Sequence, residues 1–92
     1  MTQSRGEALA NLLAEAKKLQ AYRADGATYC EKCDNLVVRI QSILGNVSVN
    51  DLSDGDIRII KSIKEFIITE ETFARSSADL RDRHKWLGSI NE

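Results

Sequence analysis

The chain has 92 residues, 42% of them hydrophobic and 29% charged, which is typical of one folded domain and excludes a disordered chain. Its net charge of −1 lacks the basic excess that is typical of a dedicated nucleic-acid-binding domain. The sequence contains no proline and no apolar run near the roughly 20 residues of a membrane span, so we expect capped helices and no membrane segment.

The first predicted helix covers residues 5–25. Ser4 followed by Glu7 has the spacing of a capping box, and Gly26 is positioned to end the helix as a left-handed residue. Glu7 and Asn11 interrupt the apolar stretch, which is unlike a secretory signal, so we expect a cytoplasmic protein. Apolar residues recur at steps of three and four and predict one buried face: Leu9, Leu12, Leu13, Ala16 and Leu19.

The second predicted helix covers residues 29–44. Thr28 with Glu31 fits a second capping box, and Gly45 follows the helix as a stop signal. In the connector that follows, apolar and polar residues alternate from 47 to 52, and we expect a short extended segment across the bundle. The helix itself carries a wide apolar face and is predicted to be the most buried one: Tyr29, Cys30, Cys33, Leu36, Val37, Ile40, Ile43 and Leu44.

The third predicted helix begins after Ser53, which has Asp56 three residues later, and its apolar pattern continues far along the chain. Positions at alternating steps of four and three form a heptad stripe: Ile59, Ile63, Phe66, Glu70, Phe73, Ser77, Leu80, His84 and Leu87. One helix over this span would be about 50 Å long, against about 30 Å for the first helix.

Such a long helix would lack a partner over half its length, so either the chain dimerises as a coiled coil or the helix breaks. Ser76 and Ser77, with Asp79 after them, form a capping signal, and we expect the break near Ser76. The sequence therefore predicts a single all-α domain over residues 1–92. It is a bundle of three to four helices at about 5–25, 29–44, 54–75 and 77–88, with the last two as one long helix in the alternative.

Cys30 and Cys33 form a C-x-x-C motif at the start of the second predicted helix. A redox motif of this kind follows a strand in a βαβ unit, which is not indicated here. A zinc site needs about four ligands, and the chain adds only His84 to the two cysteines unless Asp34 or a second chain contributes. We therefore expect no cofactor and no metal, and we predict that both thiols pack in the core.

Cations recur three apart on the third predicted helix, at Arg58, Lys61 and Lys64, and such a row suits an acidic partner or phosphates. A second basic cluster over residues 81–85 is interrupted by Asp82, and it lies late in its helix, where cations cap carbonyl groups. Trp86 follows this cluster, and a tryptophan there suits either an interface or an anchor onto the core.

No catalytic constellation is visible, so we expect a non-enzymatic protein-protein interaction module. Small inhibitors, immunity proteins, antitoxins and phage accessory proteins are often built this way. The partner is another protein, a second copy of the chain, or both. The alternative is a helical nucleic-acid-binding regulator that uses the basic row. The predicted partner-binding residues lie on the C-terminal helices: Arg58, Lys61, Lys64, Phe73, Leu80, His84 and Trp86.

Overall fold

The computed structural model describes residues 4–45 and 49–90. The helices in these ranges are α1 (Arg5–Lys18), α2 (Gly26–Leu44), α3 (Asp54–Ile67), α4 (Glu70–Arg75) and α5 (Ala78–Ser89), with 3-10 turns at Leu19–Tyr22 and Val49–Asp51. This architecture confirms the predicted all-α class. No helix in the described ranges has the length and apolar character to cross a membrane.

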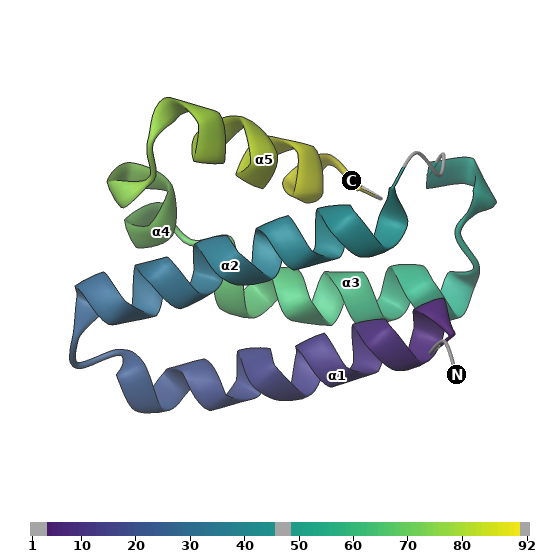
Figure 1. Cartoon of the computed structure of the whole chain (residues 1–92), viewed down its shortest axis with the longest axis horizontal. Coiled ribbons are helices and arrows are strands. Elements are labelled where there is room, and N and C mark those ends of the chain that lie inside the picture. The colour runs from purple at the N-terminus through teal and green to yellow at the C-terminus, as the bar shows by residue number, and fades with distance from the viewer. Residues whose placement is uncertain (1–3, 46–48, 91–92) are drawn as a thin grey trace.

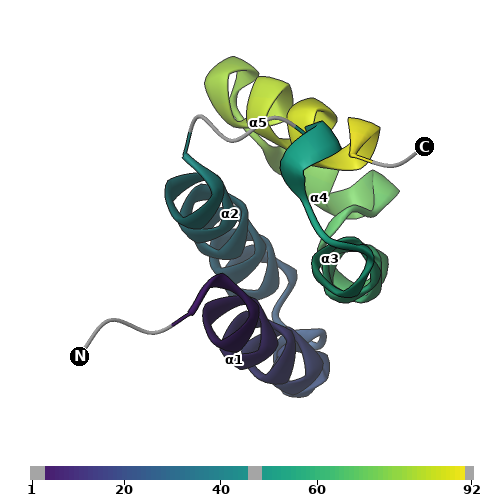
Figure 2. The same ribbon diagram turned by 90° about the vertical axis from the view of Figure 1, so that its right-hand side faces the viewer.

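Helices α1, α2 and α3 pack against one another and form a three-helix bundle (Figure 1). The end-on view in Figure 2 places these three helices at the corners of a triangle, with α5 beyond α2 on the side away from α1. Helices α4 and α5 form a hairpin that packs on α2. One face of α2 therefore meets α1, and another carries the hairpin. The fully buried apolar side chains come from α1, α2, α3, α5 and Ile90: Leu9, Leu12, Ala16, Cys33, Val37, Ile40, Ile60, Ile63, Ile67, Leu87 and Ile90.

Three helix starts follow the predicted capping pattern. The Ser4 hydroxyl accepts a hydrogen bond from the backbone N–H of Glu7 at 3.2 Å, and the Ser53 hydroxyl accepts one from Asp56 at 3.1 Å. Ser77 likewise caps α5, with 3.4 Å between its hydroxyl oxygen and the backbone nitrogen of Leu80. Each hydroxyl satisfies one of the N–H groups that a helix leaves unpaired at its first turn.

The junction of the first two helices differs from the prediction of helices at 5–25 and 29–44. Regular α-helix ends at Lys18, and α2 begins at Gly26 because Asp25, not Thr28, is its cap. The Asp25 carboxylate accepts hydrogen bonds from both the backbone N–H and the hydroxyl of Thr28. Since aspartate is the stronger N-cap, it takes the role and draws Thr28 into the first turn. The left-handed role predicted for Gly26 is therefore wrong. Gly45 ends its helix with the expected positive φ, +56°, but its ψ of −128° lies outside the left-handed helical region.

The third predicted helix, 54–75, is broken once more than expected. Helix α3 ends at Ile67, and α4 begins after Thr69. The Thr69 hydroxyl accepts a hydrogen bond from the Thr72 backbone N–H at 3.2 Å, and the Thr72 hydroxyl accepts one from the Thr69 backbone N–H at 3.0 Å. The buried Thr72 hydroxyl also donates to the Ile67 carbonyl, 2.8 Å away. This reciprocal capping satisfies the backbone at the corner, so the chain turns within two residues.

The break expected near Ser76 is confirmed, because α4 ends at Arg75 and Ser77 caps α5. The long-helix alternative is wrong, and the heptad stripe is not one seam: Phe73 and Ser77 are exposed whereas Ile63 and His84 are buried. The extended segment predicted for the connector is replaced by the 3-10 turn Val49–Asp51 in its described part, and residues 46–48 lie outside the described residues.

Candidate functional site

The predicted basic row does not act as a unit. Arg58 and Lys61 are exposed on α3, but the Lys64 ammonium donates to the carbonyl oxygens of Gly88 and Ile90, at 2.8 and 2.9 Å. These carbonyls are at the C-terminus of α5, where a cation complements the helix dipole. Lys64 therefore ties α5 to α3, and the exposed part of the row consists of Arg58 and Lys61.

His84 is buried inside the hairpin contact, with 1% of its surface exposed. Its Nε2 lies 2.7 Å from Oδ1 of Asp34 on α2. The Ser76 hydroxyl lies 3.1 Å from the same oxygen and 2.7 Å from the Thr72 carbonyl oxygen, and these two acceptors share its single hydrogen. We call Asp34, Ser76 and His84 the anchor cluster. It joins α2 to both helices of the hairpin, and within the described residues the Nδ1 atom of His84 has no hydrogen-bond partner.

Leu80 and Trp86, also predicted to bind a partner, are half-buried on α5. The Trp86 side chain packs against the main core. The backbone carbonyl of Trp86 accepts a hydrogen bond from the Ser89 hydroxyl at 2.6 Å. Of the two roles open for this tryptophan, the geometry favours the anchor onto the core. Its indole remains a reporter of whether α5 is docked.

The basic cluster over residues 81–85 spreads in several directions from α5. Arg83 donates to the Gln41 side chain on α2 at 3.2 Å and pairs with Asp79 at 3.3 Å. Arg81 donates to the carbonyls of Phe73 and Ala74, at 3.1 and 3.2 Å, and so caps the end of α4. These contacts rigidify the hairpin and orient what remains exposed on it.

Phe73 is the exposed aromatic of the hairpin, with 36% of its surface accessible. The Arg81 guanidinium carbon and the Lys85 ammonium nitrogen each lie 5.8 Å from the centre of its ring. Cations at this distance are attracted to the negative face of an aromatic ring. Phe73, Arg81 and Lys85, with the half-buried Leu80 of the same helix as the two cations, make up what we call the hairpin surface, an exposed aromatic ring with two cations near it.

The two cysteines lie in the core, as predicted. Burial raises the pKa of the Cys33 thiol to about 12, and burial, with Glu71 nearby, raises that of Cys30. A raised pKa keeps a thiol neutral and unreactive. In the described part of the chain, no three His, Cys, Asp or Glu side chains are grouped closely enough to hold a metal ion.

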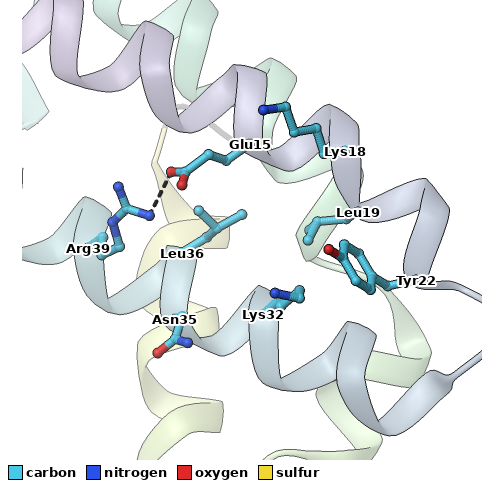
Figure 3. Close-up of a pocket in the computed structure, with 8 residues that line it drawn as sticks. All are labelled: Glu15, Lys18, Leu19, Tyr22, Lys32, Asn35, Leu36 and Arg39. Atoms are coloured by element: carbon cyan, nitrogen blue, oxygen red, sulfur yellow. Dashed lines mark ion pairs between the residues drawn. The ribbon is translucent and has the colours of Figure 1, made fainter.

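A groove that the sequence did not indicate lies between α1, with its 3-10 extension, and α2 (Figure 3). It has a volume of about 260 Å³ and is lined by charged side chains over an apolar floor. Its members are far apart in the sequence: Glu15, Lys18 and Tyr22 come from one side, and Lys32, Leu36 and Arg39 from the other. Only the antiparallel packing of the two helices brings them together, so no local motif could have shown the site.

Comparison with known proteins adds no family to this description. No family model matches the chain, and neither a curated protein nor a solved structure matches it. The two surfaces described above are therefore the features from which a function can be inferred.

Proposed function

We propose that the chain is a non-enzymatic protein-interaction module whose hairpin surface binds an acidic segment of a partner protein. The observation that carries the proposal is the exposed Phe73 ring, with the cations of Arg81 and Lys85 each 5.8 Å from its centre. Aromatic residues and arginine are enriched where protein interfaces gain most of their binding energy. An apolar side chain of the partner covers the ring, and its carboxylates meet the cations.

The charges of the hairpin surface favour an acidic partner. Over the described residues, neither Arg81 nor Lys85 forms an ion pair with a carboxylate, whereas the nearby Asp79 is paired with Arg83 at 3.3 Å. The two cations are therefore available to a partner's carboxylates. A complementary charge raises the association rate and selects against basic partners.

The hairpin surface is also held in place before binding. The anchor cluster and Lys64 connect α4 and α5 to α2 and α3. A surface that is already ordered loses less conformational entropy on association. In this proposal His84 and Lys64, expected at the sequence level to touch the partner, instead position the residues that do.

The proposal is tested by selecting displayed peptides against the immobilised protein and measuring the affinity of the enriched ones. We expect acidic sequences with one or two large apolar residues. Phe73→Ser is expected to weaken binding about tenfold or more, as hot-spot truncations do. Lys85→Gln is the better test of charge than a change at Arg81, because Arg81 also caps α4.

Two matched controls separate this surface from the rest of the molecule. Tyr22→Ser removes an aromatic of similar exposure, 40%, on the opposite side of α2, and it should leave binding unchanged. Lys61→Gln removes an exposed cation of α3 and should also have little effect. Peptide binding that depends on Lys61 and not on Lys85 would contradict the proposal and place the binding surface on α3.

Self-association is a distinct outcome of the same variants. Light scattering on the wild-type chain measures its mass in solution. A dimer that becomes a monomer in Phe73→Ser would assign the hairpin surface to a second copy of the chain and would overturn the acidic partner. A monomer in both leaves the surface to a foreign protein, as proposed.

A further inference from the structure

The groove between α1 and α2 is independent of the hairpin surface. Figure 3 shows Glu15 of α1 directed at Arg39 of α2 and Lys32 of α2 beside the Tyr22 ring, whereas Lys18 lines the groove from α1 with its side chain running along that helix. The hairpin contacts α2 through Asp34 and Gln41, whereas the groove uses Lys32, Leu36 and Arg39. The groove and the attachment of the hairpin therefore use different residues of α2, and the hairpin surface itself lies on α4 and α5.

The charge of the groove is positive although the whole chain carries −1. Three cations and one carboxylate line it, and that carboxylate, Glu15, pairs with Arg39 at 2.6 Å. Both side chains are about half exposed overall, although the Glu15 oxygen that meets Arg39 is itself buried, so solvent screens the pair only in part. Arg39 keeps further N–H donors for a second anion, since a guanidinium has five.

Lys18 and Lys32 supply the remaining charge. Lys18, in the last turn of α1, makes no ion pair within the described residues. The Lys32 ammonium lies 4.6 Å from the centre of the Tyr22 ring, which holds it at the groove. Together with Arg39, these two lysines make the potential in the groove positive, which attracts an anion.

The floor of the groove is apolar, since Leu19 and Leu36 are almost fully buried below it. A cavity of about 150 Å³ lined by apolar side chains is large enough for benzene. The groove, at about 260 Å³, has room for a ring of that size together with an anionic group. The volume and the positive charge of the groove therefore both suit a small aromatic ring that carries an anionic group.

We propose that this groove binds a small organic anion, in which a carboxylate or a phosphate monoester is joined to a flat apolar group. The anionic group lies among Lys18, Lys32 and Arg39. The apolar group rests on Leu19 and Leu36, beside the Tyr22 ring. The proposal does not depend on the protein partner of the hairpin surface.

The test is an NMR titration of the wild-type chain with phenyl phosphate and with benzoate. We expect saturable shifts confined to residues 15–22 and 32–39, with a Kd on the order of 1 mM, as suits ligands this small. The tighter of the two probes identifies the anionic group. Benzyl alcohol has the aromatic ring without the anionic group, and inorganic phosphate has the anionic group without the ring. Both should bind at least about tenfold more weakly than the better probe.

Neighbouring lysines of α1 provide a matched pair of variants. Lys18→Gln is expected to raise the Kd about fivefold at low ionic strength, whereas Lys17→Gln, one residue away and outside the groove, should change it less than about twofold. Equal effects of the two variants would overturn the proposal, as would equal binding of benzyl alcohol or an absence of shifts. Phe73→Ser should leave the titration unchanged, so failure here is distinguishable from failure at the hairpin surface.

Discussion

Replacement of His84 by alanine tests how the hairpin is held on the bundle. The imidazole is 1% exposed, and its Nε2 lies 2.7 Å from the Asp34 carboxylate. Losing a hydrogen bond to a charged group costs about 1.5–3 kcal/mol, and the cavity left by a buried ring adds about 1–2 kcal/mol. We therefore expect a loss of about 3–5 kcal/mol, a large share of the roughly 5–15 kcal/mol that stabilises a domain.

Urea titration followed by two signals locates this loss. Trp86, the single tryptophan of the chain, lies on α5 and reports the docking of the hairpin, while circular dichroism reports helix content of the whole chain. In His84→Ala we expect the tryptophan transition to move to lower urea than the dichroism transition. Coincident transitions at an unchanged midpoint would refute the anchoring role of His84.

A double-mutant cycle separates the hydrogen bond from the packing. His84→Gln keeps an N–H donor near the position of Nε2 and should recover at least about 1 kcal/mol of the loss. His84→Ala combined with Asp34→Ala should be less destabilising than the sum of the two single variants, by more than about 1 kcal/mol. Effects that add within about 0.5 kcal/mol would mean that the two side chains are not coupled.

Two further predictions concern glycines and thiols. Gly45 has φ +56° and ψ −128°, so Gly45→Ala should destabilise the fold by about 1–3 kcal/mol. Gly88 lies inside α5 with open space at its Cβ position, so Gly88→Ala should stabilise the fold by about 0.5–1 kcal/mol. Thermal melts of the two variants check both signs. Burial raises the pKa of Cys33 from 9.0 to about 12, so the folded state favours the neutral thiol, and its contribution to stability should be lost as pH rises from about 9 to about 12. Urea titrations at pH 8 and 10.5 should show this loss, and Cys33→Ala should reduce it; an equal loss in the variant would contradict the assignment.

Local signals in the sequence were sufficient to predict most helix starts. Ser4, Ser53 and Ser77 each cap a helix through a hydroxyl and an N–H three residues later, an interaction that depends on four consecutive residues. The errors arose where two local signals competed. Asp25 and Thr28 both qualify as caps, and the stronger acceptor prevailed.

The corner at Thr69 and Thr72 was missed for a related reason. Its capping box uses threonine where the usual pattern has glutamate or glutamine, and the flanking isoleucines continue the apolar periodicity of α3. The roles of Lys64 and His84 could not be predicted at all. Each depends on a partner 24 to 50 residues away, and a charge that bonds to a distant carbonyl has the same sequence signature as a solvated one.

The attachment of the hairpin has a consequence for the order in which the chain folds. Its polar links to α2 join residues 42 to 50 apart, as in Asp34 with Ser76 and with His84, and Gln41 with Arg83. Contacts so distant in sequence form slowly, because a long loop must close before they stabilise anything. During synthesis, the face of α2 that carries Asp34 and Gln41 emerges from the ribosome well before residues 76–84 that cover it. This face therefore stays uncovered, and open to chaperones and wrong partners, until the hairpin has been synthesised.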